Sequence, residues 1–149
     1  MQLKDFLDED LIIAELQSET KHEVIRELIE PLRATHQELD IDKAYKVLVE
    51  REQLGSTGIG EGVAIPHGKM PELENIVLVV GRSTSGVDFA ALDFRLCNIF
   101  FLVLAPEHVA GLHLRILAHV SRLLRDESFR QAFMSAKDGN ALWELLEGV

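Results

Sequence analysis

The sequence is poor in several features that would assign it to particular classes of protein. Its 149 residues include one cysteine, Cys97, so no internal disulfide and no thiolate metal cluster can form. We expect Cys97, which lies beside an apolar run, to be a small core residue. The longest apolar run, 99–105, is far shorter than the roughly 20 residues that span a bilayer, and the first residues form no apolar signal segment. We therefore expect a cytoplasmic protein without membrane insertion.

Basic residues are also scarce. The chain has 15 lysines and arginines against 25 aspartates and glutamates, which gives a net charge of −10. Binding to nucleic acid or to an anionic membrane surface requires a basic footprint, so this balance argues against both. A basic protein partner fits the charge better.

The order of apolar patterns indicates one α/β domain over residues 1–149, without repeats or linkers. Two continuous apolar runs, 76–80 and 99–104, are typical of strands buried on both faces, so helices must cover both sides of the sheet. The segment 83–86 between them is predicted to be a turn.

Helices are predicted on both sides of this central region. One begins at Thr20, where Thr20 and Glu23 form the pattern of a capping box, and it ends or kinks at Pro31. Another runs from about residue 41 to 52, with Asp40 as its cap. After Pro106, three more are expected over about 109–124 and from near residues 126 and 138, the last two capped by aspartates.

The segment 55–69 is the most informative part of the chain. Four glycines in the eight positions 55–62 free the backbone, so that its amides can turn toward one point. His67 follows, held between Pro66, which fixes its own φ, and Gly68, which leaves the space beside the imidazole open. A rigid, unshielded imidazole beside free amides suits a nucleophile that accepts phosphate, whereas the glycines alone are equally compatible with a tight turn.

Two known nucleotide motifs do not fit this segment. A P-loop that ends at Gly68 and Lys69 needs glycine at Val63 and a hydroxyl at Met70. A dinucleotide fingerprint that begins at Gly58 also needs glycine at Val63. We therefore expect no nucleotide cofactor.

His113 falls within the apolar face of the helix expected over 109–124. It is either a core histidine that bonds a backbone carbonyl or, if it lies beside His67, part of an active site. His119 lies at the edge of the same face and is expected to be solvated. His113 and His119 do not share a helical face, and no His-Glu-x-x-His motif is present, so no metal is expected.

Arg51 lies near the end of the helix that precedes the glycines. Its guanidinium can reach a phosphoryl group in the loop through two parallel hydrogen bonds. The alternative is a surface pair with Lys46 and Glu50, the neighbours of Val47, and spacing alone does not decide between the two.

Together these residues resemble the active-site signature of the fructose/mannitol-type enzyme IIA domain of the bacterial phosphotransferase system, of which nitrogen-regulatory IIA proteins form a branch. The resemblance rests on the motif Arg51-Glu52-x-Leu54-Gly55-Ser56-Thr57-Gly58-Ile59-Gly60-x-Gly62-x-Ala64-Ile65-Pro66-His67-Gly68-Lys69. Weaker matches follow in the family's order at 86–93 and 106–117, so that it covers essentially the whole chain. One departure is Asp93-Phe94-Arg95-Leu96, where the family often has Asp-Gly-x-Pro-Val.

The resemblance implies a mixed sheet flanked by helices on both faces, which we expect to have five strands. It implies that Nε2 of His67 accepts a phosphoryl group from the histidine of HPr or of its nitrogen-branch counterpart, with Arg51 and His113 as the matching catalytic arginine and second histidine. No metal or other cofactor is required, because the donor is itself a phosphohistidine.

Charge on the transferred group has to be stabilised. We expect the backbone amides of Gly58 and Gly68 to donate to the phosphoryl oxygens, with the hydroxyls of Ser56 and Thr57 as further donors.

Three functions remain open at this point. The chain is a regulatory phosphocarrier read by target proteins, a sugar-transport IIA component that passes phosphate to a IIB domain, or a module that binds a phosphorylated small molecule without transfer. The sequence contains no IIB or membrane segment, and its glycine motif resembles the nitrogen branch, so the regulatory carrier is favoured.

Overall fold

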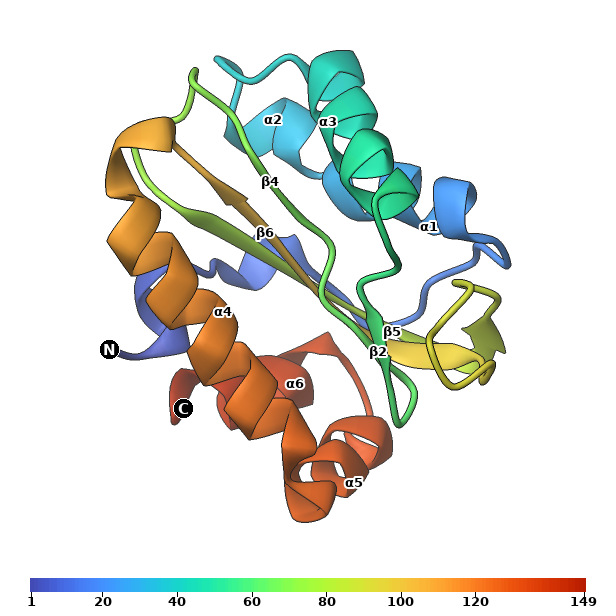
Figure 1. Ribbon diagram of the computed structural model, residues 1–149. Coiled ribbons are helices and arrows are strands. Elements are labelled where there is room, and N and C mark those ends of the chain that lie inside the picture. The colour runs from blue at the N-terminus through green and yellow to red at the C-terminus, as the bar shows by residue number, and fades with distance from the viewer.

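The computed structural model describes residues 1–149 as a sheet between two layers of helices (Figure 1). The sheet has six strands in the order β1-β5-β6-β3-β2, with β4 also paired to β6. Their bounds are β1 Ile12–Ile13, β2 Gly58–Gly60, β3 Val63–Ala64, β4 His67–Lys69, β5 Val77–Val87 and β6 Cys97–Ala105. The expected mixed sheet is confirmed, with one strand more than the five expected, because strands of two or three residues leave no periodic pattern.

Strand β6 organises the sheet. It pairs antiparallel with β5 and parallel with both β3 and β4. The runs 77–80 and 99–105 are buried throughout, as expected for strands covered on both faces. The predicted turn at 83–86 is wrong, because β5 continues to Val87 through an irregular register, where Asn98 Nδ2 donates to the Ser83 carbonyl at 2.8 Å.

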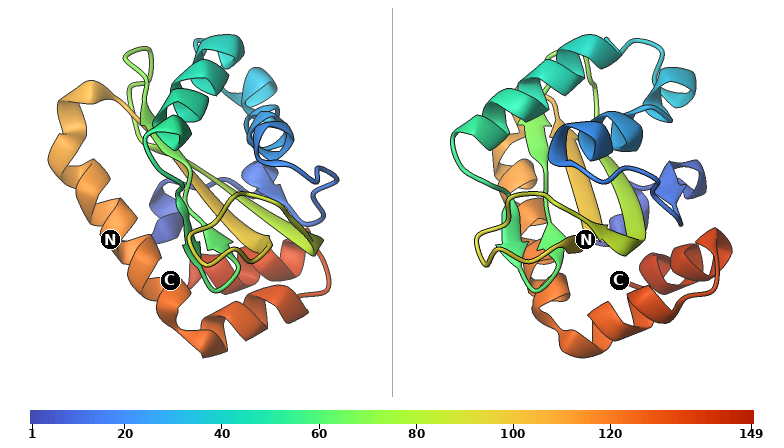
Figure 2. Two further views of the ribbon diagram at one scale, coloured as in Figure 1. Left: turned by 45° about the vertical axis from the view of Figure 1, so that its right-hand side comes forward. Right: turned by 90° about the vertical axis from the view of Figure 1, so that its right-hand side faces the viewer.

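The helices cover both faces of the sheet, as the expectation required. Figures 1 and 2 show the N-terminal helices on one side and the C-terminal helices on the other. The first layer contains α1 Lys21–Ile29, α2 Leu32–Thr35 and α3 Ile41–Gln53, and the second contains α4 Ala110–Arg125, α5 Glu127–Ser135 and α6 Gly139–Glu147. Short 3₁₀ turns lie at η1 Leu3–Asp5, η2 Glu9–Leu11 and η3 Glu107–Val109. None of the helices combines the length and the apolar character needed to cross a bilayer.

Three of the six α-helices begin at a capping aspartate. Asp40, Asp126 and Asp138 accept backbone amides at the starts of α3, α5 and α6, as predicted. The capping box predicted at the start of α1 is wrong, because the Thr20 hydroxyl donates to the Glu23 carboxylate at 2.7 Å and caps no backbone amide.

Arg82 is a buried charge that the sequence did not reveal. It lies on β5 and is 6 % exposed. Its guanidinium donates to the carbonyls of Ala14 and Phe133, each at 3.0 Å, and to that of Ala136 at 2.5 Å. Arg82 therefore satisfies the carbonyls that α5 leaves free at its C-terminal end and ties this helix to the sheet.

Replacing Arg82 should destabilise the fold. We expect Arg82→Met to lower the free energy of unfolding by about 3 kcal/mol, because buried carbonyls would lose their donors. Urea denaturation measures this loss, and Arg95→Met is the control, since the Arg95 side chain is 69 % exposed. Equal stabilities of the two variants would contradict the structural role of Arg82.

Candidate active site

A cleft of about 670 Å³ lies between the end of α3, strand β4 and the first turn of α4. Its walls bring together parts of the chain that are more than 40 residues apart in the sequence. The lining residues are Val47, Glu50, Arg51, Gln53, Leu54, His67, Gly68, Lys69 and His113. All three residues expected to be catalytic, and one of the four expected phosphate ligands, therefore share one cleft.

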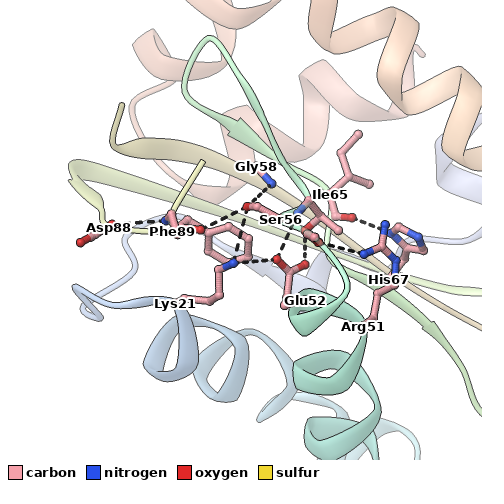
Figure 3. A network of polar contacts seen from close by, with 12 residues as sticks. Lys21, Arg51, Glu52, Ser56, Gly58, Ile65, His67, Asp88 and Phe89 are labelled. Atoms are coloured by element: carbon pink, nitrogen blue, oxygen red, sulfur yellow. Dashed lines mark hydrogen bonds and ion pairs between the residues drawn. The ribbon is translucent and has the colours of Figure 1, made fainter. Parts of the chain in front are cut away.

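His67 is held in one tautomer by its own backbone. Its Nδ1 lies 2.8 Å from the carbonyl oxygen of Ile65 (Figure 3). A carbonyl only accepts hydrogen bonds, so Nδ1 must carry the proton and Nε2 keeps its lone pair. The strand is anchored at this point, because Val103 of β6 donates to the Pro66 carbonyl at 2.9 Å. The ring therefore presents an unprotonated nitrogen from a fixed backbone.

Gly68 lets α3 approach β4 closely. A Cβ atom at this position would lie 2.8 Å from Cγ1 of Val47, so a larger residue would force the Val47 side chain to shift. The glycine thus brings the end of α3, and with it Arg51, close to the imidazole of His67.

His113 lies beside His67 within the cleft. The two ring centroids are 6.0 Å apart and the rings are inclined at 76°. His113 is 5 % exposed, and its buried Nε2 has no hydrogen-bond partner in the protein. Burial, and then the proximity of His67 and Lys69, lowers the pKa of His113, which favours the neutral form of its ring. A neutral ring with an unpartnered nitrogen can act on a group bound to His67.

Arg51 is directed toward the loop that follows α3. Its Nη1 donates to the carbonyl of Gly55 at 2.9 Å, and its side chain lines the same cleft as His67. Arg51 therefore bonds the Gly55 carbonyl and does not form the surface pair with Glu50 that the alternative interpretation expected. The cation is available to a negative group in the cleft.

The remaining expected phosphate ligands do not line the cleft. Thr57 is 4 % exposed, and both its amide and its hydroxyl donate to Glu52. The hydroxyl of Ser56 accepts the Gly58 amide at 3.0 Å and donates to the Phe89 carbonyl at 3.3 Å. The donors of these residues are used within the protein, so the glycine loop is built around internal hydrogen bonds.

Comparison with known proteins identifies the family of this chain. Residues 5–149 match the family model described as "Phosphoenolpyruvate-dependent sugar phosphotransferase system, EIIA 2". The chain belongs to this family. It is 35 % identical to a nitrogen regulatory protein of Bradyrhizobium diazoefficiens over 98 % of this chain and 95 % of that protein. It is also 33 % identical to the fructose-specific EIIABC component of Bacillus subtilis, over 98 % of this chain and 23 % of that protein.

Solved structures show the same fold. Nitrogen regulatory protein IIA-Ntr of Neisseria meningitidis superposes with a TM-score of 0.89 at 28 % identity, over 97 % of this chain and 98 % of that one. IIA mannitol of Escherichia coli superposes with a TM-score of 0.77 at 22 % identity, over 93 % and 97 % of the two chains. The mixed α/β fold of this IIA domain is therefore the fold of its structural neighbours.

Sequence reasoning assigned no role to two other charged residues of this IIA domain. Lys69 lines the cleft and adds a second basic side chain to it. Glu52 is buried beneath the glycine loop, although on a helical pattern it looks like an ordinary solvated acid beside Arg51. Its only signal in the sequence was its place within the quoted motif.

The titration of His113 tests the electrostatics of the cleft. We expect its pKa to lie below the ordinary value of about 6.5, which an NMR titration of the imidazole protons measures. The folded state favours the neutral ring, so this contribution to stability is complete above the ordinary pKa and is lost as pH falls toward the lowered one. A His113→Gln variant should therefore show a weaker loss of stability over that range, and an equal loss in both proteins would contradict the interpretation.

Proposed function

We propose that this IIA domain is a phosphocarrier that accepts a phosphoryl group on Nε2 of His67 from the phosphohistidine of an HPr-type carrier protein. One observation carries the proposal. The hydrogen bond from Nδ1 to the Ile65 carbonyl leaves Nε2 as the basic nitrogen of a ring that lines an open cleft with Arg51 and His113. Family membership supports the same chemistry, since the family is named for phosphoryl transfer.

The transfer exchanges one nitrogen–phosphorus bond for another. The lone pair on Nε2 of His67 attacks phosphorus in line, and the bond to the donor imidazole breaks, returning its electron pair to the donor ring. The proton on Nδ1 stays in its hydrogen bond to Ile65 throughout, so the imidazole becomes cationic as the bond forms. No proton has to leave the site, and no metal or nucleotide takes part in these steps.

The protein's task is then to stabilise negative charge. A phosphoryl group carries nearly two negative charges at neutral pH. Arg51 and Lys69 place positive charge at the cleft, and Nε2 of His113 is free to donate a hydrogen bond to a phosphoryl oxygen when it carries a proton. These three side chains therefore act on the transferred group without forming a covalent bond.

The regulatory branch is the better assignment for the downstream role. The identity of 35 % to a nitrogen regulatory protein extends over nearly the whole of both chains. We infer that phosphorylation of His67 is read by regulatory target proteins.

A transport role is the second candidate. The fructose-specific relative and the solved complex of enzyme IIA mannitol with phosphorylated enzyme IIB mannitol favour it. In that case a IIB domain receives the phosphoryl group. Comparing the rates of charging by sugar-branch and nitrogen-branch carriers distinguishes the two roles.

The His67→Ala variant tests the phosphocarrier proposal. We expect no labelling when it is incubated with labelled phosphoenolpyruvate, enzyme I and an HPr-type carrier, because the accepting nitrogen is missing. In the unchanged protein the label should be lost in acid and kept in alkali, as for a phosphohistidine. His108→Ala is the matched control, since His108 lies on η3 outside the cleft. Full labelling of His67→Ala would refute the proposal, and binding of phosphorylated small molecules without labelling would favour the non-catalytic module.

Arg51→Met should slow charging by roughly 10- to 100-fold, as measured by rapid-quench labelling. An unscreened cation about 4 Å from the phosphoryl group is worth about 4 kcal/mol at an effective dielectric of 20, but Arg51 is partly exposed and solvent screens it. Arg33→Met is the control, because Arg33 lies on α2 in an exposed ion pair. Equal rates in the two variants would remove Arg51 from the mechanism.

A further inference from the structure

We propose that Lys21 and Glu52, a buried ion pair beneath the glycine loop, are positioning residues that hold His67 in the tautomer needed for transfer. The inference rests on the proposed function of His67. It concerns residues that touch neither the imidazole nor the cleft.

Glu52 is a carboxylate with all its contacts inside the protein. Its side chain is 2 % exposed, and such a charge is costly to bury unless it is paired and hydrogen-bonded. Lys21 Nζ lies 3.0 Å from one carboxylate oxygen, and the same oxygen accepts the Thr57 amide at 3.0 Å. The other oxygen accepts the Thr57 hydroxyl. The carboxylate therefore holds Thr57 by both of its donors.

Lys21 is largely enclosed as well, although less completely than Glu52. It is the first residue of α1, and its side chain is 17 % exposed. Its ammonium lies 4.7 Å from the centroid of the Phe89 ring and 3.5 Å from the hydroxyl of Ser56. Figure 3 shows the ion pair between α1, α3 and the loop, so a shift of the loop would separate two charges in a place that water barely reaches.

A continuous series of hydrogen bonds leads from this ion pair to the imidazole. The carbonyl of Thr57 accepts the amide of Ile65 at 3.0 Å. The carbonyl of Ile65 then accepts Nδ1–H of His67 at 2.8 Å. Each residue in the series is thus held by the one before it, from Glu52 through Thr57 and Ile65 to His67.

The chemical consequence lies in the tautomer of His67. A neutral imidazole carries its proton on either nitrogen, and the hydrogen bond to Ile65 selects Nδ1. If Thr57 moved, the Ile65 carbonyl would lose its fixed place and the ring could carry the proton on Nε2. That tautomer has no lone pair on Nε2, the nitrogen proposed to attack phosphorus, so the buried ion pair raises the fraction of the protein that is ready to react.

Glu52→Gln tests this inference with two measurements on the full chain. The ¹⁵N shifts of the His67 ring report its tautomer in the uncharged protein, without any phosphoryl donor. Labelling by an HPr-type carrier reports the transfer rate, and urea denaturation gives the fraction folded. We expect more of the Nε2–H tautomer and a rate that is lower by roughly 10- to 100-fold in the folded protein.

Glu72→Gln is the matched control for that variant. Glu72 also pairs with a lysine, Lys43, but neither residue lines the cleft. This variant should keep both the tautomer and the rate of the unchanged protein.

Thr57→Val and Thr57→Ser provide an independent pair of variants. The first removes the hydroxyl that bonds Glu52 and the second keeps it. We expect Thr57→Val to shift the tautomer as Glu52→Gln does, and Thr57→Ser to keep the tautomer of the unchanged protein. If Glu52→Gln does not fold, this pair of variants tests the positioning role of the ion pair in its place.

The possible outcomes separate this inference from the proposed function. Lower stability with an unchanged tautomer and rate would show a purely structural ion pair and overturn the inference, while the function of His67 would stand. A protein that is never labelled, but whose His67 tautomer responds to Glu52→Gln, would refute the proposed function and uphold the positioning of the ring.

Discussion

The hydrogen bond between Nδ1 of His67 and the carbonyl of Ile65 is the contact on which the rest of the site depends. It joins the residues on either side of Pro66, where the chain passes from β3 to β4 in one continuous parallel register along β6. It requires a fixed backbone on each side. Strand β4 anchors one side through β6, and the Thr57 carbonyl anchors the other through the Ile65 amide. The ring of His67 is thus held in place by the sheet and by the glycine loop together.

The cleft has an electrostatic character opposite to that of the whole protein. The chain carries a net charge of −10, yet Arg51, Lys69 and two histidines meet around the cleft, with Glu50 as the one acid in its lining. Burial favours the neutral form of His113, so the free protein avoids a cluster of cations next to His67. The basic side chains that would attract a phosphoryl group are therefore concentrated at the cleft, and the overall composition does not reveal them.

Family membership and chemistry constrain the function to different degrees. Nitrogen regulatory proteins and fructose-specific transport components both match nearly all of this chain, so the site alone does not separate their roles. The departure at 93–96 lies on the surface of the protein, where Phe94 is 97 % exposed with a φ of 62° at a position where the family often has glycine.

Local patterns in the sequence determined the helix and strand types, the aspartate caps and the motif around His67, because each depends on a few neighbouring residues. They did not determine the continuation of β5 through 83–86 or the two-residue strands, which exist only through pairing with another segment. The same reason explains Ser56 and Thr57. Their type suggested phosphate ligands, but Phe89 and the buried Glu52 use their hydrogen bonds. Only the tertiary structure decided which donors face the cleft, because burial and long-range contacts decide which polar groups remain free.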